Sequence, residues 1–186
     1  MEIIIAENSG FCFGVKRSVD LAEQALKSNK DKYTLGPLIH NPQLVESYEK
    51  QGLKLLDRGD ALKIKDSLIV VRAHGESADL KKTLIENGNE ILDATCPILS
   101  NIYKKIIKKE DEGYQVVIVG DREHPEIKAM DSYLKNGIII IDETEAKNVK
   151  SEKPIYVVSQ TTNREDFYYN IANTLKENNG SVVIEN

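Results

Sequence analysis

The chain has 186 residues with a formal net charge of −5, and 40% of its residues are hydrophobic and 30% charged. This composition is typical of a globular protein with a sizeable core, and the negative charge argues against nonspecific nucleic-acid binding, which needs a cationic surface. No apolar run approaches the roughly 18 residues that span a bilayer, and residues 1–5 lack the features of a secretory signal. We therefore expect a cytoplasmic protein with no membrane partner.

A cysteine between two glycines marks the first predicted junction. Residues 10–15 read Gly-Phe-Cys-Phe-Gly-Val, after an apolar run at 3–6 and before a helical pattern with Val15, Val19, Ala22 and Leu26 as its apolar face. At a strand-to-helix junction the free N–H groups and the helix dipole stabilise a thiolate. Taken alone, Cys12 is better explained as a packing residue.

Apolar runs and helical periodicity alternate along the rest of the chain. We expect strands at residues 32–36, 53–56, 67–73, 90–92, 115–120, 138–141, 155–158 and 182–184. We expect further helices after Asn41 and Ser77, which can act as N-caps, from Cys96, and over residues 127–134 and 167–175. Residues 57–66 are expected to form a polar loop.

The same order of strands, cysteine and helices occurs twice. It predicts an α/β fold with mainly parallel sheets, in two units at residues 1–95 and 96–186. Residues 87–93, before Cys96, resemble residues 179–185, so we expect the chain to stop short of a third unit with its own cysteine. The alternative is that these are two ordinary helix-to-strand connections.

Most reactive side chains follow a predicted strand, where ligands bind in open α/β sheets. They are Cys12, Cys96, His40, His74, His124 and residues 159–162. The adjoining helix starts offer N–H groups, and the histidines offer ring donors that become cationic beside an anion. The pattern therefore favours phosphate or diphosphate binding, although each histidine alone could be an ordinary surface or core residue.

A carboxyl group accompanies the expected anion site. Glu126 lies two residues after His124, and Thr161 and Thr162 supply hydroxyl groups. A carboxyl beside a dianion has a raised pKa, which equips it to deliver a proton. Alternatively, Glu126 only complements the dipole of its helix.

The cysteines lack the C-x-x-C spacing of redox pairs and zinc ribbons, and a structural disulfide is not expected in a reducing compartment. Equivalent positions in three repeated units would bring three thiolates together. Three suffice for an iron–sulfur cluster with one iron free of protein ligands, whereas Cys12 and Cys96 alone make a poor cluster site.

Six motifs, in order and spread over the chain, resemble the 4-hydroxy-3-methylbut-2-enyl diphosphate reductase family of the methylerythritol phosphate route to isoprenoids. They are residues 10–15, 39–41, 73–75, 93–97, 124–126 and 159–162. The resemblance implies a pseudo-threefold arrangement of three α/β domains around a [4Fe-4S] cluster. It makes Cys12 and Cys96 two of three cluster ligands, places the third cysteine in a domain absent from this sequence, and associates residues 1–11 with that domain.

The resemblance also implies the reaction and the roles at the site. His40, His74 and His124 surround the substrate diphosphate, and Glu126 is the proton source. Thr161 supplies a hydroxyl group near Glu126 and the substrate, and Gln160 and Thr162 adjoin it. The C4 hydroxyl is removed reductively with electrons from ferredoxin or flavodoxin, giving isopentenyl and dimethylallyl diphosphates. The activity of the 186 residues alone is left open.

Two other functions remain as alternatives. One is a non-catalytic phosphate- or diphosphate-binding α/β module with inert cysteines. The other is a thiol-dependent hydrolase, for which the sequence shows no base next to Cys12 or Cys96.

Overall fold

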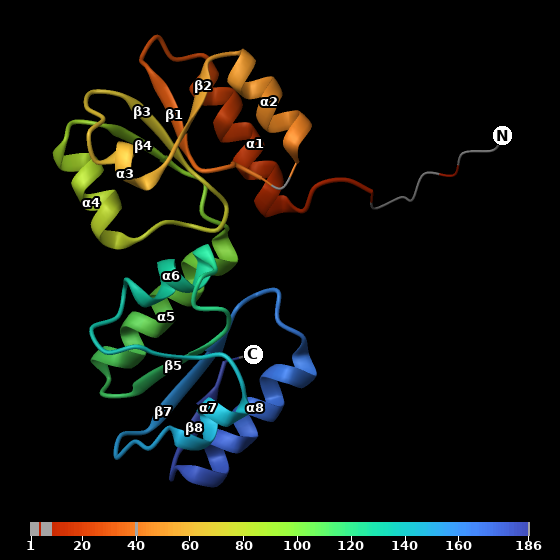
Figure 1. Ribbon diagram of the computed structural model, residues 1–186, viewed down its shortest axis with the longest axis vertical. Helices are drawn as coiled ribbons and strands as arrows, with labels where there is room; N and C mark the ends of the chain where they lie inside the picture. Colours follow the sequence, from red (N-terminus) through yellow and green to blue (C-terminus); the bar gives the residue numbers. More distant parts are fainter. Residues whose placement is uncertain (1–3, 5–8, 40, 186) are drawn as a thin grey trace. The chain divides into compact units, whose positions relative to one another are not determined.

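The computed structural model describes residues 4, 9–39 and 41–185, and it contains two four-stranded sheets (Figure 1). Residues of the chain make most of their contacts within one of two compact units. The first unit is Met1–Ala73 with Thr83–Pro97, and the second is His74–Lys82 with Ile98–Asn186. The segment His74–Lys82 thus belongs with the second unit, whereas the sequence places it in the first.

The first unit is a parallel sheet with helices on both faces. Its strands have the order β2-β1-β3-β4, and all three neighbouring pairs are parallel. Helices α1 and α2 cover one face, and α3 and α4 lie on the other (Figure 1). The elements are α1 (Phe13–Leu26), β1 (Lys32–Leu35), α2 (Pro42–Lys50), β2 (Leu53–Leu56), α3 (Arg58–Ala61), β3 (Leu68–Val71), α4 (Ala78–Glu86), of which residues 78–82 count with the second unit, and β4 (Glu90–Asp93).

The second unit repeats this architecture element by element. Its strands have the order β6-β5-β7-β8, again all parallel. The predicted α/β fold class with parallel sheets is therefore confirmed. The elements are α5 (Pro97–Asp111), β5 (Gln115–Val119), α6 (Pro125–Asp131), β6 (Ile138–Ile140), α7 (Glu143–Asn148), β7 (Ile155–Ser159), α8 (Glu165–Asn178) and β8 (Val182–Ile184).

Continuous apolar runs form the centre of each sheet. In the second unit Val117 and Val157 are fully buried and pack with Ile171 and Leu175 of α8, which confirms the predicted face of that helix. Strands covered by helices on both faces lose the polar alternation of a half-exposed strand. This is why residues 115–119 and 155–158 could be recognised as buried parallel strands.

The predicted face of α1 packs against the core of the first unit, but small residues lie at the centre of the contact. Gly14, Ser18, Ala22 and Ala25 are buried, whereas Val15, Val19 and Leu26 are only partly buried. The small side chains allow the helix backbone to approach the sheet, so the larger residues lie at the edges of the contact. Among the described helices, none is long and apolar enough to cross a membrane.

Two short helices were missed in the sequence. Helix α3 forms inside the expected polar loop, and α7 follows β6, each capped by an aspartate. The Asp57 side chain accepts from the Asp60 N–H, and the Asp142 side chain accepts from the Glu145 N–H. Each helix buries a single alanine, which is too little to produce a hydrophobic period.

The longer helices begin largely as predicted. Asn41 and Ser77 cap α2 and α4, accepting from the N–H groups of Leu44 and Leu80 at 3.0 and 3.4 Å. Helix α6 ends at Asp131, earlier than the predicted residue 134. Of the apolar run 3–6, only Ile4 is described, and it is exposed and forms no strand.

A buried asparagine fixes the connection between α4 and β4. The Asn89 side chain accepts from the Ser67 N–H at 3.0 Å and donates to the carbonyls of Ile64 and Leu84, both at 2.9 Å. One side chain therefore ties the start of β4 to the end of α4 and to the segment before β3.

Asn179 does the same in the second unit. It accepts from the Ser151 N–H at 2.9 Å and donates to the carbonyls of Val149 and Leu175 at 3.1 and 2.9 Å. When residues 87–93 are matched with residues 179–185, Asn87 is at the position equivalent to Asn179. The hydrogen bonds pair Asn179 with Asn89 instead, because Asn89, like Asn179, accepts from one backbone N–H and donates to two carbonyl groups.

Candidate functional site

The centre of the second sheet is where a ligand site is expected. Strands β5 and β7 are neighbours, and the chain builds outward from them in opposite directions, to β6 and to β8. In open α/β sheets, ligands bind outside the carboxyl ends of the strands at such a switch point. The loops that leave β5 and β7 carry the predicted residues His124 and Thr161.

Glu126 and Thr161 are joined across this switch point. The Glu126 side chain is 1% exposed, and its carboxylate accepts from the Thr161 N–H at 2.7 Å and from the Thr161 hydroxyl at 2.8 Å. Thr161 itself is exposed. The hydroxyl thus connects a buried carboxyl group with the surface, which is an arrangement that can relay a proton.

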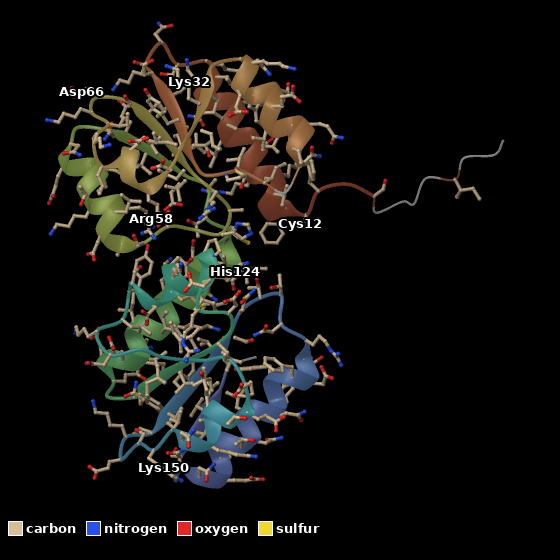
Figure 2. The ribbon with its side chains drawn as sticks, viewed as in Figure 1. Cys12, Lys32, Arg58, Asp66, His124 and Lys150 are labelled. Atoms are coloured by element: carbon tan, nitrogen blue, oxygen red, sulfur yellow. The ribbon has the colours of Figure 1, made fainter. Side chains whose placement is uncertain are left out.

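Two histidines lie together in the same unit. His124 is the N-cap of α6, just before Pro125, and its Nδ1 accepts from the Glu126 N–H at 3.2 Å (Figure 2). The His74 ring meets the His124 ring edge-on, with centroids 5.8 Å apart. His74, His124, Glu126 and Thr161 are therefore brought together as predicted from their positions after strands.

Two stacked tyrosines hold the segment that carries His74. The Tyr103 hydroxyl donates to the His74 carbonyl at 3.1 Å, and the Tyr133 hydroxyl donates to the Glu76 carbonyl at 3.4 Å. Their rings stack with centroids 4.8 Å apart. Neither tyrosine was singled out in the sequence. The helical spacing of Tyr103 from Ile106 marks it as buried, but it does not reveal the carbonyl that it binds.

We expect Tyr103→Phe to loosen this segment. Losing one hydroxyl-to-carbonyl hydrogen bond should lower the free energy of unfolding by about 1 kcal/mol and speed amide exchange around His74. Urea unfolding and hydrogen exchange measure both effects, with Tyr33→Phe in the first unit as the control. Equal exchange rates at residues 74–77 in the two variants would contradict the assigned role.

Gln160 bridges the loops after β5 and β7. Its Oε1 accepts from the Asp121 N–H at 3.2 Å, and its Nε2 donates to the Thr162 hydroxyl at 2.8 Å. Gly120 leaves room for this side chain, since an added Cβ there would lie 2.9 Å from the Gln160 Cβ. Gln160 and Thr162 thus hold the loops together, and their predicted contact with a substrate stays a prediction.

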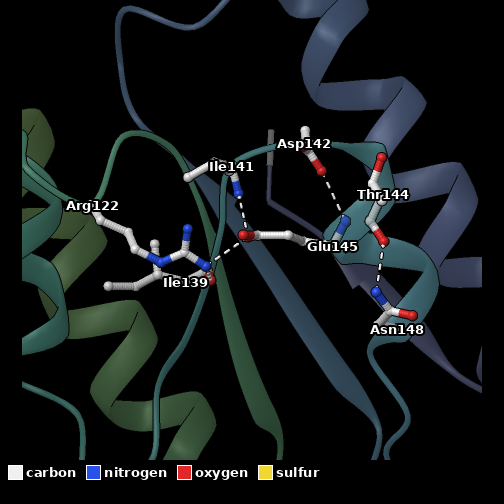
Figure 3. Close-up of polar contacts among 7 residues, drawn as sticks. All are labelled: Arg122, Ile139, Ile141, Asp142, Thr144, Glu145 and Asn148. Atoms are coloured by element: carbon white, nitrogen blue, oxygen red, sulfur yellow. Dashed lines mark hydrogen bonds and ion pairs between the residues drawn. The ribbon is translucent and has the colours of Figure 1, made fainter.

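An ion pair anchors the loop before α6 (Figure 3). The Arg122 guanidinium donates to the Glu145 carboxylate at 2.6 Å and to the Ile139 carbonyl at 2.9 Å. The same carboxylate accepts from the Ile141 N–H at 3.0 Å. The hydrogen bonds from Arg122 and from the Ile141 backbone lower the pKa of Glu145. Helix α7, unseen in the sequence, therefore supports the loop that leads to His124.

This ion pair should make stability depend on pH. Because the pKa of Glu145 is lower in the folded state, the contribution is complete above the unfolded value of about 4.3 and is lost as the pH falls through the folded value. We expect Glu145→Gln to have a lower free energy of unfolding than the native protein near neutral pH. In acid we expect the two proteins to become equally stable. Urea unfolding across this range tests it, with Glu143→Gln on the same helix as the control. A deficit that does not change with pH would contradict the prediction.

The two cysteines lie in the first unit. Cys12 is the exposed N-cap of α1 (Figure 2), and the half-buried Cys96, whose N–H donates to the Ala73 carbonyl at 2.9 Å, directly precedes α5. A Cβ added at Gly14 would lie 3.0 Å from the Cys96 Sγ and 4.0 Å from the Cys12 Sγ. Both thiols are therefore within reach of one point that no side chain fills.

The chemistry of this pair fits part of a metal site. Two thiols beside an unfilled position suit a soft metal or an iron–sulfur cluster. Within residues 4, 9–39 and 41–185, however, no group of three or more His, Cys, Asp and Glu side chains could hold a metal ion. The described residues thus supply two thiol ligands and need others to complete the set.

A cavity of about 430 Å³ adjoins Thr161 on the side of α5 and α8. Its lining includes Lys105 and Glu185, which form an ion pair with each other. The one lysine of this lining is thus already neutralised, so the cavity is poorly suited to a phosphate group. His40 lies outside the described residues, and its predicted role stays a prediction.

Comparison with known proteins places these residues in a family. The model for "LytB protein" matches residues 3–186. The 4-hydroxy-3-methylbut-2-enyl diphosphate reductase of Caldanaerobacter subterraneus subsp. tengcongensis is 37% identical over the whole chain, which covers 66% of that protein. The reductase of Aquifex aeolicus is 39% identical over 90% of the chain, which covers 59% of that protein.

A solved structure agrees with these relatives. The structure of (E)-4-hydroxy-3-methyl-but-2-enyl diphosphate reductase superposes with a TM-score of 0.88 at 34% identity, over 99% of this chain and 66% of that one. The Plasmodium falciparum reductase, at 23% identity and a TM-score of 0.84, shares the fold. This chain thus spans about two thirds or less of the length of these proteins. It belongs to the LytB protein family.

Proposed function

We propose that the protein is a 4-hydroxy-3-methylbut-2-enyl diphosphate reductase, which removes the C4 hydroxyl of its substrate reductively and forms isopentenyl and dimethylallyl diphosphates. The observation that carries this proposal is the Glu126–Thr161 pair beside His74 and His124 at the switch point of the second sheet. The relatives named as this reductase support the choice of substrate.

The residues of the second unit would bind the anion and move protons. His74 and His124 would donate hydrogen bonds to the diphosphate, and Gln160 and Thr162 would adjoin it. We propose the same role for His40 of the first unit. The reaction consumes two electrons and two protons: the C4–O bond breaks, the oxygen leaves as water after one proton is added, and the allyl group takes up the other. Glu126 would supply protons through the Thr161 hydroxyl.

Cys12 and Cys96 would be two of three thiolate ligands of a [4Fe-4S] cluster. When bound, the cluster would supply the electrons and a Lewis-acidic iron. We further propose that the two units are two of three repeated domains, the third providing the remaining cysteine. Ferredoxin or flavodoxin is the proposed electron donor.

Product formation tests the proposal directly. Protein made from its native coding sequence is purified without oxygen and incubated with 4-hydroxy-3-methylbut-2-enyl diphosphate and reduced ferredoxin. We expect both isomeric diphosphates by mass spectrometry. If neither product forms while the protein contains iron and acid-labile sulfide, the proposed substrate is wrong.

Iron content separates this function from a phosphate-binding module with inert cysteines. Reconstitution with iron and sulfide should give broad visible absorption in the native protein and much less in Cys12→Ser or Cys96→Ser. Protein that binds pyrophosphate but takes up no iron would favour the binding module. Iron content equal to that of the native protein in both variants would show that the ligand assignment is wrong.

A further inference from the structure

The hydrogen bond at the start of α6 determines where His124 carries its proton. A backbone N–H can only donate, so the Glu126 N–H, 3.2 Å from the His124 Nδ1, needs a lone pair on that nitrogen. In the neutral ring the proton is then on Nε2. An imidazolium would carry protons on both nitrogens and would lose this bond.

The carboxylates close to His124 in sequence have hydrogen-bond partners other than its ring. Glu123, the residue before it, has its carboxylate 2.6 Å from the Lys128 ammonium. The Asp121 carboxylate accepts from the Glu123 N–H at 2.9 Å. The Glu126 carboxylate is bound to Thr161, and the other ring in contact with His124 is that of His74.

We propose that His124 meets the substrate anion as a neutral Nε2–H donor, while its Nδ1 holds the Glu126 backbone in place. This rests on the proposed function for the anion and on the geometry for the second role. His124 is thus also a positioning residue for Glu126, and protonating it would break the link that aligns the proton donor. The proposal thus departs from the expectation that this histidine becomes cationic beside the anion.

The first unit contains a neutral side chain in a comparable place. Asn41 is the N-cap of α2, is followed by Pro42, and accepts from the Leu44 N–H at 3.0 Å. An asparagine amide has an acceptor and a donor, as a neutral histidine does, but it does not ionise near neutral pH. His124→Asn therefore keeps both proposed roles of the ring, whereas His124→Lys supplies a charge and no acceptor.

The tautomer can be measured without any substrate. In the chain labelled with ¹⁵N-histidine, two-bond proton–nitrogen correlations distinguish the two neutral rings and the imidazolium. The signal that disappears in His124→Asn belongs to His124, and we expect it to show the Nε2–H form near neutral pH. An imidazolium or an Nδ1–H pattern would overturn the proposal, whatever the protein's activity.

Binding of inorganic pyrophosphate tests the role toward an anion. By calorimetry at neutral pH we expect the dissociation constant of His124→Asn for pyrophosphate to be within about threefold of that of the native chain. The asparagine amide supplies one acceptor and one donor, as the neutral ring does. We expect His124→Lys to bind more weakly and to shift the Glu126 amide resonance. Tighter binding by the lysine variant than by the asparagine variant would overturn the neutral-donor role. Native protein that binds no pyrophosphate would count against the proposed function, while the tautomer measurement would still decide the positioning role.

Discussion

Replacing Glu126 with glutamine should lower turnover of the diphosphate substrate by about a hundredfold or more while leaving the fold intact. General acids contribute roughly a hundredfold to ten-thousandfold to rates, and an amide cannot deliver a proton. Glutamine has nearly the same shape, and one of its two polar atoms can still accept from Thr161. The loss should therefore appear in kcat rather than in the free energy of unfolding.

The neighbouring Glu123 provides the control for this change. Its side chain is 82% exposed and pairs with Lys128, so Glu123→Gln removes the same charge three residues away without touching Thr161. We expect its kcat to match that of the native protein. Equal losses in both variants would mean that net charge near the histidines, and not proton delivery by Glu126, limits the rate.

Replacing Gly14 with alanine should reduce iron binding far more than stability. The new Cβ would lie 3.0 Å from the Cys96 Sγ, so that thiol must move by a few tenths of an ångström. Alanine favours a helix over glycine by about 1 kcal/mol, which offsets much of the strain. Displaced ligands typically weaken metal sites by about tenfold or more, so iron content should fall while the urea midpoint changes little.

Gly180→Ala is the matched control for Gly14→Ala. It adds the same methyl group where nothing lies within 4 Å, and it should leave iron content unchanged. Both variants are made in protein from the native coding sequence and reconstituted together. Native iron content in Gly14→Ala would show that the space between Cys12 and Cys96 does not matter to the proposed cluster.

Most of the fold could be predicted because its strands are buried on both faces. Residues 68–71, 116–119 and 155–158 are continuous apolar runs. Because helices alternate with these strands, the pattern favours parallel pairing, which the structure shows. What the pattern could not show was α7, whose single buried residue is Ala146. Nor could it show that α1 also packs through Gly14 and Ser18, since hydrophobicity scales favour larger residues.

The site was predictable as a set of positions but not as a set of contacts. A parallel sheet places the carboxyl ends of its strands at one edge, which brings His124 and Thr161 together from residue order alone. The hydrogen bonds that Thr161 donates to Glu126 depend on side-chain directions that no spacing encodes. The supporting contacts of Tyr103 and Arg122 depend on the fold as a whole, because their partners are distant in sequence.

The buried side chain of Asn89 limits how this protein can change in length. It binds three backbone groups at once, so adding or removing one residue between α4 and β4 would break all three bonds or shift β4 along its neighbour. Cys96 lies seven residues after Asn89 in the chain. A shift of β4 along its neighbour would therefore move the Cys96 thiol away from Gly14. Insertions in this family should therefore avoid that connection and gather instead in loops such as the one after α3, where a changed length leaves the cysteine in place.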